Sequence, residues 1–413
     1  MRQEKSEIII VGAGPSGAVA AGLLRRAGRT VTILEKADFP RFVIGESLLP
    51  QSMEYIEAAG MLQDVIEAGF QFKNGAAFAC GNRYAHFDFR QKFTPGWGTT
   101  YQVQRGPFDK VLADAAARQG ADIRYRHEVT AVDVSGEKPV VTVHPENGED
   151  YRLTGEFLLD ASGYGRVLPR LLDLDIASEL PVRQAIFTHI EDRIAQNTEA
   201  AFDRDKILIS VPPDETDVWF WLIPFSNGRS SIGVVGRREQ FDTRDDKEQL
   251  LDRVRRTPNL AKLLKNAVWD TPVRNIVGYS ANVKALYGRN FALLGNTTEF
   301  LDPVFSSGVT IAFKSSDLAV KALLKQLAGE PVDWEREYAA PLKVGVEAFR
   351  AFVTAWYDRR LQDIIFAPNK PPEVERMVSA VLAGYAWDEK NPFVARPERR
   401  LASVQTACVS AAA

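Results

Sequence analysis

The chain is poor in sulfur and shows no excess of basic residues. Its 413 residues include only two cysteines, four methionines and four histidines, and the formal net charge is −3. Cys80 and Cys408 are far apart and suggest neither a disulfide framework nor a zinc site, which favours a reducing, cytoplasmic setting. The scattered histidines lack ligand spacing and are interpreted as surface or packing residues, so no metal is expected. Without a basic footprint, nucleic acid is not expected as a partner.

Long apolar runs are also missing. No segment approaches the roughly 18–20 apolar residues of a membrane-spanning helix. The polar N-terminus leads directly into a strand-like run and lacks the apolar centre of a signal peptide. A chain of this length is typical of a large enzyme with two or three packed subdomains.

The first forty residues have the order of a dinucleotide-binding βαβ unit. Residues 7–11 form a β-branched run, which is typical of a strand buried on both faces. A glycine-rich turn follows, then a run of helix formers to residue 26, and a second strand over residues 30–34 that is closed by Glu35. Glu35 is placed to accept hydrogen bonds from ribose hydroxyls.

The turn between strand and helix carries the pattern GxGxxG. Gly12 permits the tight turn, Gly14 lets the backbone approach a pyrophosphate, and Gly17 lets the helix pack on the sheet. The helix starts at Pro15-Ser16-Gly17, and its free amides, which proline lacks, face the phosphates at the positive end of the helix dipole. This unit predicts a dinucleotide cofactor but does not distinguish FAD from NAD.

Three distant segments narrow the cofactor. Residues 157–163 are a strand ending in DASG, residues 290–296 are a strand ending in Gly295-Asn296, and Arg105 lies in the sequence VQRGPFD. Together with the βαβ unit, they resemble the set shared by FAD-dependent aromatic hydroxylases, geranylgeranyl reductases and flavin-dependent halogenases, over residues 7 to about 330. The resemblance implies that FAD is the cofactor and that these segments line it. Besides the turn and Glu35, the implied FAD-binding residues are Lys36, Arg41, Gly45, Glu46, Ser47, Arg105, Asp160, Gly295, Asn296 and Pro303.

We therefore expect an α/β fold: a Rossmann-like FAD-binding domain with an inserted β-rich substrate domain and a C-terminal helical segment. The FAD-binding domain is expected at 1–50, 100–175 and 275–335, and the substrate domain at 51–99 and 176–274. Within the second insertion, alternating strands are predicted at 206–210, 218–223 and 230–235. Residues 336–413 form the helical region. Its aromatic residues favour packing on the core, with a lid over the substrate pocket as the alternative, and the small and polar residues after 396 are expected to be loose.

Three features make the chain resemble the flavin-dependent halogenases in particular. Residues 219–224, WFWLIP, match that family's WxWxIP motif, and residues 300–308, FLDPVFSSG, resemble its FxxPxxSxG segment. Lys73 precedes a glycine-alanine pair, as a characteristic lysine of the family does. The resemblance implies that Trp219, Trp221, Pro224 and Phe305 wall the active site, and that the amides of Ser307 and Gly308 hold a halide ion.

The implied chemistry consumes reduced FAD, oxygen and chloride or bromide, and makes hypohalous acid. Lys73 then passes the electrophilic halogen to an electron-rich ring. Its aromatic neighbours Phe70, Phe72 and Phe78 suggest an apolar surround, which would lower the pKa of the amine. A surface lysine is the alternative interpretation.

Two departures locate the chain within the family. Asn296 stands where flavin enzymes often have aspartate, and Phe305 stands where free-tryptophan halogenases have glutamate. The sequence therefore resembles the branch that acts on phenols or pyrroles, often tethered to a carrier protein, in secondary-metabolite or pigment biosynthesis. The resemblance also implies a separate flavin reductase as partner. An FAD-dependent hydroxylase or reductase on the same scaffold remains the alternative.

Overall fold

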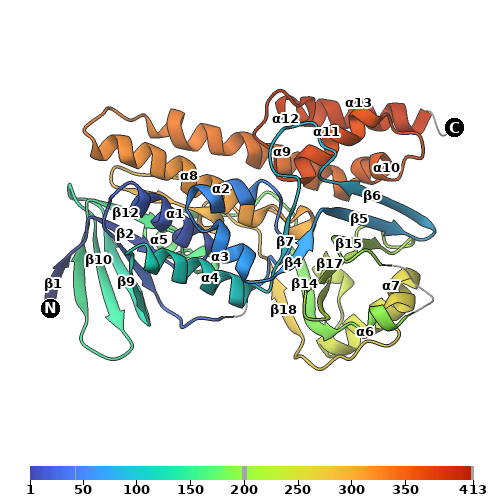
Figure 1. The fold of residues 1–413 in the computed structure, drawn as a ribbon, viewed down its shortest axis with the longest axis horizontal. Coiled ribbons are helices and arrows are strands. Elements are labelled where there is room, and N and C mark those ends of the chain that lie inside the picture. The colour runs from blue at the N-terminus through green and yellow to red at the C-terminus, as the bar shows by residue number, and fades with distance from the viewer. Residues whose placement is uncertain (42, 198–201, 411–413) are drawn as a thin grey trace.

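A parallel sheet of five strands carries the N-terminal motif in the structure, which is a computed structural model describing residues 1–41, 43–197 and 202–410 (Figure 1). Every strand pair in this sheet is parallel. In spatial order, its strands are β20 (Phe291–Leu293), β12 (Phe157–Asp160), β2 (Ile8–Val11), β3 (Val31–Glu35) and β8 (Asp122–Tyr125). Chain segments separated by more than a hundred residues thus lie side by side in one sheet.

Different layers cover the two faces of this sheet. Ile8 and Ile10 of β2 pack against helix α1 (Pro15–Arg26), which lies between α4 (Arg105–Arg118) and α8 (Gly308–Leu327). Ile9 and Val11 face the other way, onto a second sheet. That sheet has the order β1 (Arg2–Lys5), β11 (Tyr151–Thr154), β10 (Val140–Pro145) and β9 (His127–Asp133). Strand β2 is thus covered on both faces, which explains why all four of its residues are apolar.

The second large sheet has seven strands and is drawn mainly from the two predicted insertions (Figure 1). Its pairs are antiparallel except for β15 with β5, which joins the first insertion to the second. The predicted strands of the second insertion are confirmed as β15, β16 and β17. In spatial order, the strands are β18 (Arg274–Val277), β14 (Arg183–Glu191), β17 (Arg229–Arg237), β16 (Trp219–Pro224), β15 (Lys206–Val211), β5 (Gly75–Cys80) and β6 (Arg83–Asp88).

Two short ribbons and a set of small helices complete this part of the chain. The ribbons pair β4 (Gln71–Lys73) with β7 (Thr100–Gln102) and β13 (Asp175–Ile176) with β19 (Asn282–Val283). The small helices are α2 (Ser52–Ala58), α3 (Leu62–Glu67), α5 (Val167–Leu171), α6 (Asp246–Arg256) and α7 (Pro258–Leu263).

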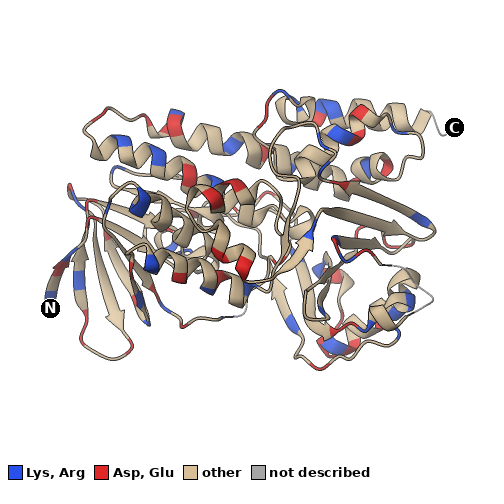
Figure 2. Ribbon diagram, viewed as in Figure 1, with Lys and Arg blue, Asp and Glu red and all other residues tan. Residues whose placement is uncertain are grey.

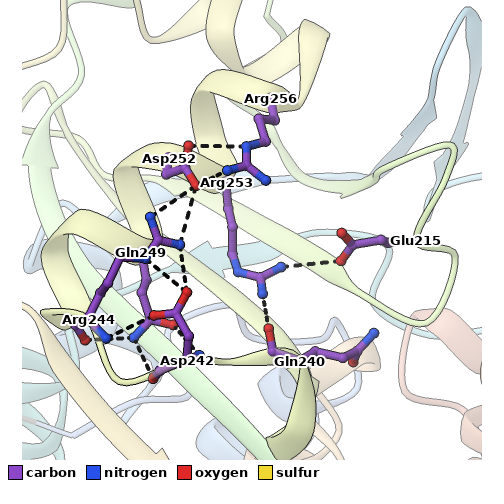
Figure 3. Close-up of polar contacts among 8 residues, drawn as sticks. All are labelled: Glu215, Gln240, Asp242, Arg244, Gln249, Asp252, Arg253 and Arg256. Carbon is purple, nitrogen blue, oxygen red and sulfur yellow. Dashed lines mark hydrogen bonds and ion pairs between the residues drawn. The ribbon is translucent and has the colours of Figure 1, made fainter.

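Helices α6 and α7 cover the outer face of the seven-stranded sheet. Their leucine and valine side chains pack against Phe220 and Leu222 of β16. Two of the three arginines of α6 are paired: Arg253 donates to Glu215 and to the carbonyl of Gln240, and Arg256 pairs with Asp252 (Figure 3). Acidic and basic residues are similarly interspersed over the rest of the ribbon (Figure 2). The cluster on α6 is therefore a solvated, neutralised surface.

The C-terminal region is helical and packs on the core. Its elements are a π-helical turn (Glu335–Ala339), α9 (Ala340–Tyr357), α10 (Arg360–Ile365), α11 (Pro372–Leu382), α12 (Pro392–Ala395) and α13 (Pro397–Ser410). Phe349, Phe352 and Trp356 of α9 are fully buried, which favours the packing role over a lid. The expectation of a loose end after residue 396 is wrong up to Ser410, because Leu401 of α13 is buried against this layer. No helix among the described residues is long and apolar enough to cross a bilayer.

Candidate active site

One cavity of about 760 Å³ connects the dinucleotide motif to the seven-stranded sheet. At one end its lining comes from the turn after β2, the end of β3 and the segments after β12 and β20. At the other end the lining comes from β14, β15 and β16. The predicted site residues on its wall are Gly12, Gly14, Pro15, Ser16, Glu35, Lys36, Arg41, Gly45, Glu46, Ser47, Arg105, Trp219, Trp221, Gly295, Asn296, Pro303 and Gly308.

The three glycines of the turn differ in the space around them. Gly12 has a φ of +97°, and a Cβ there would lie 2.6 Å from the carbonyl oxygen of Ala161. A Cβ at Gly17 would lie 2.0 Å from the carbonyl oxygen of Gly12, so only glycine lets α1 approach the sheet. At Gly14 the nearest neighbour of such an atom is Arg41 Nη2 at 3.4 Å. Gly14 is therefore open toward the cavity, which fits a pyrophosphate approached by backbone amides.

Glu35 is buried at the same end. Its carboxylate accepts hydrogen bonds from the amides of Ala13 and Ala37, both at 2.9 Å, and Arg41 Nη2 lies 3.9 Å away. Each carboxylate oxygen has a second lone pair, so ribose hydroxyls can still be accepted from the cavity side. The open glycine, the cationic Arg41 and this acceptor together fit the dinucleotide part of FAD.

The 45–48 segment runs along the cavity between the two ends. Arg105, held by a bidentate ion pair with Asp109, donates to the carbonyl of Ile44 just before it. The carbonyl of Glu46 accepts from the amide of Val103 at 2.7 Å, and the amide of Leu48 donates to Tyr101 at 3.1 Å. The segment is thus tied to β7 like an additional strand.

Several predicted residues lie behind the wall instead of on it. Asp160 is fully buried, and its carboxylate accepts from the amides of Ser162 and Leu168, so it supports the turn that lines the cavity. Burial raises the pKa of Asp160, and these hydrogen bonds oppose the rise. Gly17 is likewise a packing position.

Of the four residues predicted to wall the active site, only the two tryptophans line the cavity. Trp219, Trp221 and Ile223 face the cavity, whereas Phe220 and Leu222 face α6 and α7. Because strand side chains alternate, Pro224 does not line the cavity. Phe305 is also absent from the lining. It is buried edge-to-face against Phe352 and Trp356 of α9.

The two tryptophans that do line the cavity are fixed by hydrogen bonds. Their ring centroids are 5.9 Å apart, and Trp221 Nε1 donates to Ser231 Oγ at 2.9 Å. Trp219 Nε1 donates to the hydroxyl of Tyr357, also at 2.9 Å. Buried indole N–H groups need such partners, and here they set the ring orientations.

A buried polar network behind Trp219 was not predicted. Tyr357 and Tyr279 donate to Asp302 Oδ2 at 2.9 and 3.2 Å, and Asp302 Oδ1 accepts from the amide of Val304. The guanidinium of Arg183 stacks 3.2 Å from the ring centroid of Tyr357. Burial raises the pKa of Asp302, against the effect of its hydrogen bonds. The network joins β16, α9 and the loop before α8. Its one sequence signal is an aspartate preceding a helical turn, as a capping residue does.

The loop after this network leads into the predicted anion site. Ser306 adopts a left-handed φ of +56°, Ser307 precedes the first residue of α8, and Gly308 begins that helix. Ser306 and Gly308 line the cavity, and Ser307 is 2% exposed. The first amides of a helix have no intrahelical acceptor and favour an anion. Binding of halide to Ser307 and Gly308 stays a prediction.

Lys73 is 1% exposed and lies behind the 45–48 segment, outside the cavity lining. Its Nζ donates to Ser47 Oγ and to the carbonyl of Leu48, both at 2.7 Å, and lies 5.4 Å from the ring centroid of Phe89. No carboxylate pairs with it among the residues the structure describes. Burial lowers the pKa of Lys73 to about 7. The interpretation of Lys73 as a surface residue is therefore wrong. Of the aromatic neighbours expected to bury it, however, Phe72 is itself 40% exposed.

His189 is a further residue that the sequence did not single out. Its Nε2 lies 2.6 Å from Glu46 Oε1, so a histidine of β14 reaches the buried carboxylate of the 45–48 segment. The two residues are 143 positions apart, which explains why no motif reveals the pair.

Comparisons with known proteins agree with this geometry. Residues 5–283 match the FAD binding domain family. The 1H-pyrrole-2-carbonyl-[peptidyl-carrier protein] chlorinase of Pseudomonas fluorescens is 26% identical over 415 residues, covering 94% of this chain and 91% of that protein. The tryptophan 2-halogenase of Chondromyces crocatus is 31% identical over 79% of this chain, which spans only 62% of that protein's length. A solved flavoprotein/dehydrogenase from Cytophaga hutchinsonii is 42% identical, with a TM-score of 0.94 and coverage of 99% and 100%.

Proposed function

Because this chain belongs to the FAD-binding-domain family and, within it, to the flavin-dependent halogenases, we propose that it transfers a halogen to an electron-rich aromatic ring. The chain is an FAD-dependent oxidoreductase. The overall reaction takes reduced FAD, oxygen, a halide ion and the aromatic substrate, and yields FAD, water and the halogenated ring.

The residues at the dinucleotide end hold the cofactor. Gly12, Gly14 and the start of α1 receive the pyrophosphate, and Glu35 receives ribose hydroxyls. When bound and reduced, FAD supplies the two electrons with which oxygen converts the halide to hypohalous acid. The halide binds to the amides of Ser307 and Gly308, at the side of the cavity where α8 begins.

Lys73 is the observation that carries the proposal. Burial without a carboxylate partner disfavours the charged form of a lysine and costs folding stability. Such a residue is therefore a candidate for a functional role. With a pKa of about 7, much of this side chain is a neutral amine near neutral pH and can accept the electrophilic halogen. Burial behind the 45–48 segment keeps this amine apart from the flavin end of the cavity.

The partners of the proposed reaction follow from the relatives. Relatives named as 1H-pyrrole-2-carbonyl-[peptidyl-carrier protein] halogenases support a pyrrole substrate delivered on a carrier protein. One nucleotide-binding motif, used by FAD, leaves the reduction of flavin to a separate reductase. Cys80 and Cys408 are both free thiols in the structure, in keeping with a cytoplasmic setting in secondary-metabolite or pigment biosynthesis.

The decisive experiment is the mass of the product. Purified protein is supplied with FAD, a flavin reductase, NADH, oxygen and candidate phenols and carrier-bound pyrroles, with chloride, with bromide or with neither. We expect a mass increase that carries the isotope pattern of the halogen supplied and vanishes without halide. A halide-independent gain of one oxygen would contradict halogenation.

A dehydrogenase or hydroxylase is the second candidate. It is favoured by the solved flavoprotein/dehydrogenase, whose 42% identity exceeds that of the halogenases compared above. Such an enzyme would reduce its bound flavin directly with its own substrate or with NADH. Stopped-flow mixing of the oxidised holoenzyme with NADH alone tests the NADH-dependent form of this candidate, because the proposed halogenase should show no rapid bleaching of the flavin.

A further inference from the structure

The two hydrogen bonds of Lys73 are the starting point. Its Nζ donates to two groups of consecutive residues, Ser47 Oγ and the carbonyl of Leu48, both at 2.7 Å. Neither oxygen carries a formal charge. Ser47 also lines the cavity, so this one residue borders the cavity on one side and contacts the amine of Lys73 on the other.

A neutral amine has two N–H groups and one lone pair. When both N–H groups are donated to Ser47 and Leu48, the tetrahedral geometry of the nitrogen directs its lone pair away from both acceptors. The ammonium form has three N–H groups, and these two acceptors leave the third without either of them. The two acceptors therefore give the neutral amine a single orientation, with its lone pair directed away from both of them.

The segment itself is held from two sides. Its backbone is hydrogen-bonded to Tyr101 and Val103 at the edge of β7. On the remaining side, Glu46 is bonded to His189 of the seven-stranded sheet, and its carboxylate is 3% exposed. His189 thus fixes the residue that immediately precedes Ser47.

A second buried lysine in the same region, Lys206, has a carboxylate among its acceptors. Lys206 is 7% exposed, and its Nζ donates to Asn74 Oδ1 at 2.9 Å and to Asp203 Oδ2 at 2.6 Å. A carboxylate partner keeps an ammonium charged. Lys73 and Lys206 therefore differ in the charge of their acceptors, although both are buried beside β5.

We propose that Ser47 and His189 are positioning residues for Lys73: Ser47 orients the amine so that its lone pair is free, and His189 holds Ser47 in place through Glu46. The proposal rests on the proposed role of Lys73, but its test does not require halogenation. Neither positioning residue exchanges a proton or a halogen itself.

The test is a titration of Lys73 in the FAD-loaded enzyme, by NMR of lysine labelled with ¹³C at Cε. The Lys73 signal is assigned from its loss in Lys73→Arg. Ser47→Ala removes an acceptor that stabilises the ammonium more than the amine, so we expect the midpoint to fall by about one pH unit. Ser47→Thr retains the hydroxyl and should titrate like the wild type.

His189 is tested in the same way. His189→Phe should lower and broaden the Lys73 transition, whereas His189→Gln keeps a donor for Glu46 and should restore it. The Lys206 signal should not move in any of these variants, which separates a local effect from general loosening. A Lys73 midpoint that is the same in Ser47→Ala and the wild type would overturn the role of Ser47. If Ser47→Ala yields no folded holoenzyme, equal midpoints in His189→Phe and His189→Gln overturn the proposal. Absence of halogenated product with these shifts present would count against the proposed function alone.

Discussion

The two ends of the cavity are built from different kinds of contact. At the dinucleotide end, backbone groups and sequence neighbours do most of the work: Gly12, Gly14 and Glu35 lie within one βαβ unit, and Glu35 bonds to the amides of Ala13 and Ala37. At the tryptophan end, Trp219 is fixed by Tyr357, 138 positions away. We propose that the first end, a local structure, binds the cofactor and that the second, an assembly of distant side chains, determines which reaction follows. Substitutions at the two ends should therefore have separable effects.

The strongest test of this separation is Lys73→Ala. We expect halogenated product per flavin oxidised to fall by about 10²–10⁴-fold, the range typical of losing a group that acts directly on the reacting atoms. FAD content should stay stoichiometric, because Lys73 does not line the cavity. Lys206→Ala is the matched control, since it removes a second buried lysine, 7% exposed, that is paired with a carboxylate. Normal coupling of product to flavin in Lys73→Ala would end the proposed role of Lys73.

The opposite end is tested with two glycines. In Gly17→Val the new Cβ would start 2.0 Å from the carbonyl oxygen of Gly12, so the helix must move away from the sheet. We expect a loss of stability of about 1–3 kcal/mol from overpacking, together with loss of FAD. Thermal unfolding and the flavin absorbance of the purified protein measure both effects.

Gly14→Ala provides the matched comparison. Its Cβ meets only Arg41 Nη2, at 3.4 Å, so the apoprotein should unfold at the wild-type temperature while FAD binds more weakly. Equal FAD affinity in Gly14→Ala and the wild type would show that the cofactor does not approach this turn.

The difference between the two ends also explains what could be predicted from the sequence. The βαβ unit was predictable because each of its residues has a local role, and even the distinct jobs of Gly14 and Gly17 agree with the space around them. The alternation of residues 219–224 already places Trp219 and Trp221 on one face, and by the same alternation Pro224 on the other. Assigning Pro224 to the wall followed the motif instead of the periodicity.

The unpredicted contacts are those that only the assembled fold creates. The carboxylate of Asp302 is bonded to Tyr357 of α9, and that of Glu46 to His189 of β14. No spacing in the sequence predicts either pair. Burial of Lys73 was expected from aromatic neighbours in sequence, yet the ring closest to its charge is Phe89. A sequence pattern indicated that this lysine mattered, but only the structure shows what holds it.

The third test measures how the stability contribution of Lys73 depends on pH, and it requires no activity. The pKa of Lys73 is lowered to about 7 in the folded protein and returns to about 10.5 on unfolding, so the unfolded state binds more protons between these values. Burial of Lys73 therefore destabilises the protein most below pH 7, and stability returns as the pH rises toward 10.5. Relative to Lys73→Met, the wild type should gain about 2 kcal/mol in free energy of unfolding between pH 7 and pH 9. Urea unfolding at several pH values measures this difference, and parallel curves for the two proteins would mean that Lys73 is not buried uncharged.

The smallest expected effect belongs to Glu35→Gln, and it sharpens the comparison most finely. The glutamine keeps one carbonyl oxygen for the amides of Ala13 and Ala37, but its NH₂ group cannot accept, so one of the two buried hydrogen bonds is lost. Ribose hydroxyls likewise lose a charged acceptor, whose hydrogen bonds contribute on the order of 1.5–3 kcal/mol each. Because the turn retains its glycines, we expect the dissociation constant of FAD to rise about tenfold, equivalent to about 1.4 kcal/mol. At saturating FAD, however, the ratio of halogenated product to flavin oxidised should equal that of the wild type, since nothing at the tryptophan end has changed. Fluorescence titration of FAD and product analysis at high FAD measure the two quantities. A lower ratio at saturation would show that Glu35 influences the chemistry as well as the binding, and that the two ends are coupled through the cofactor.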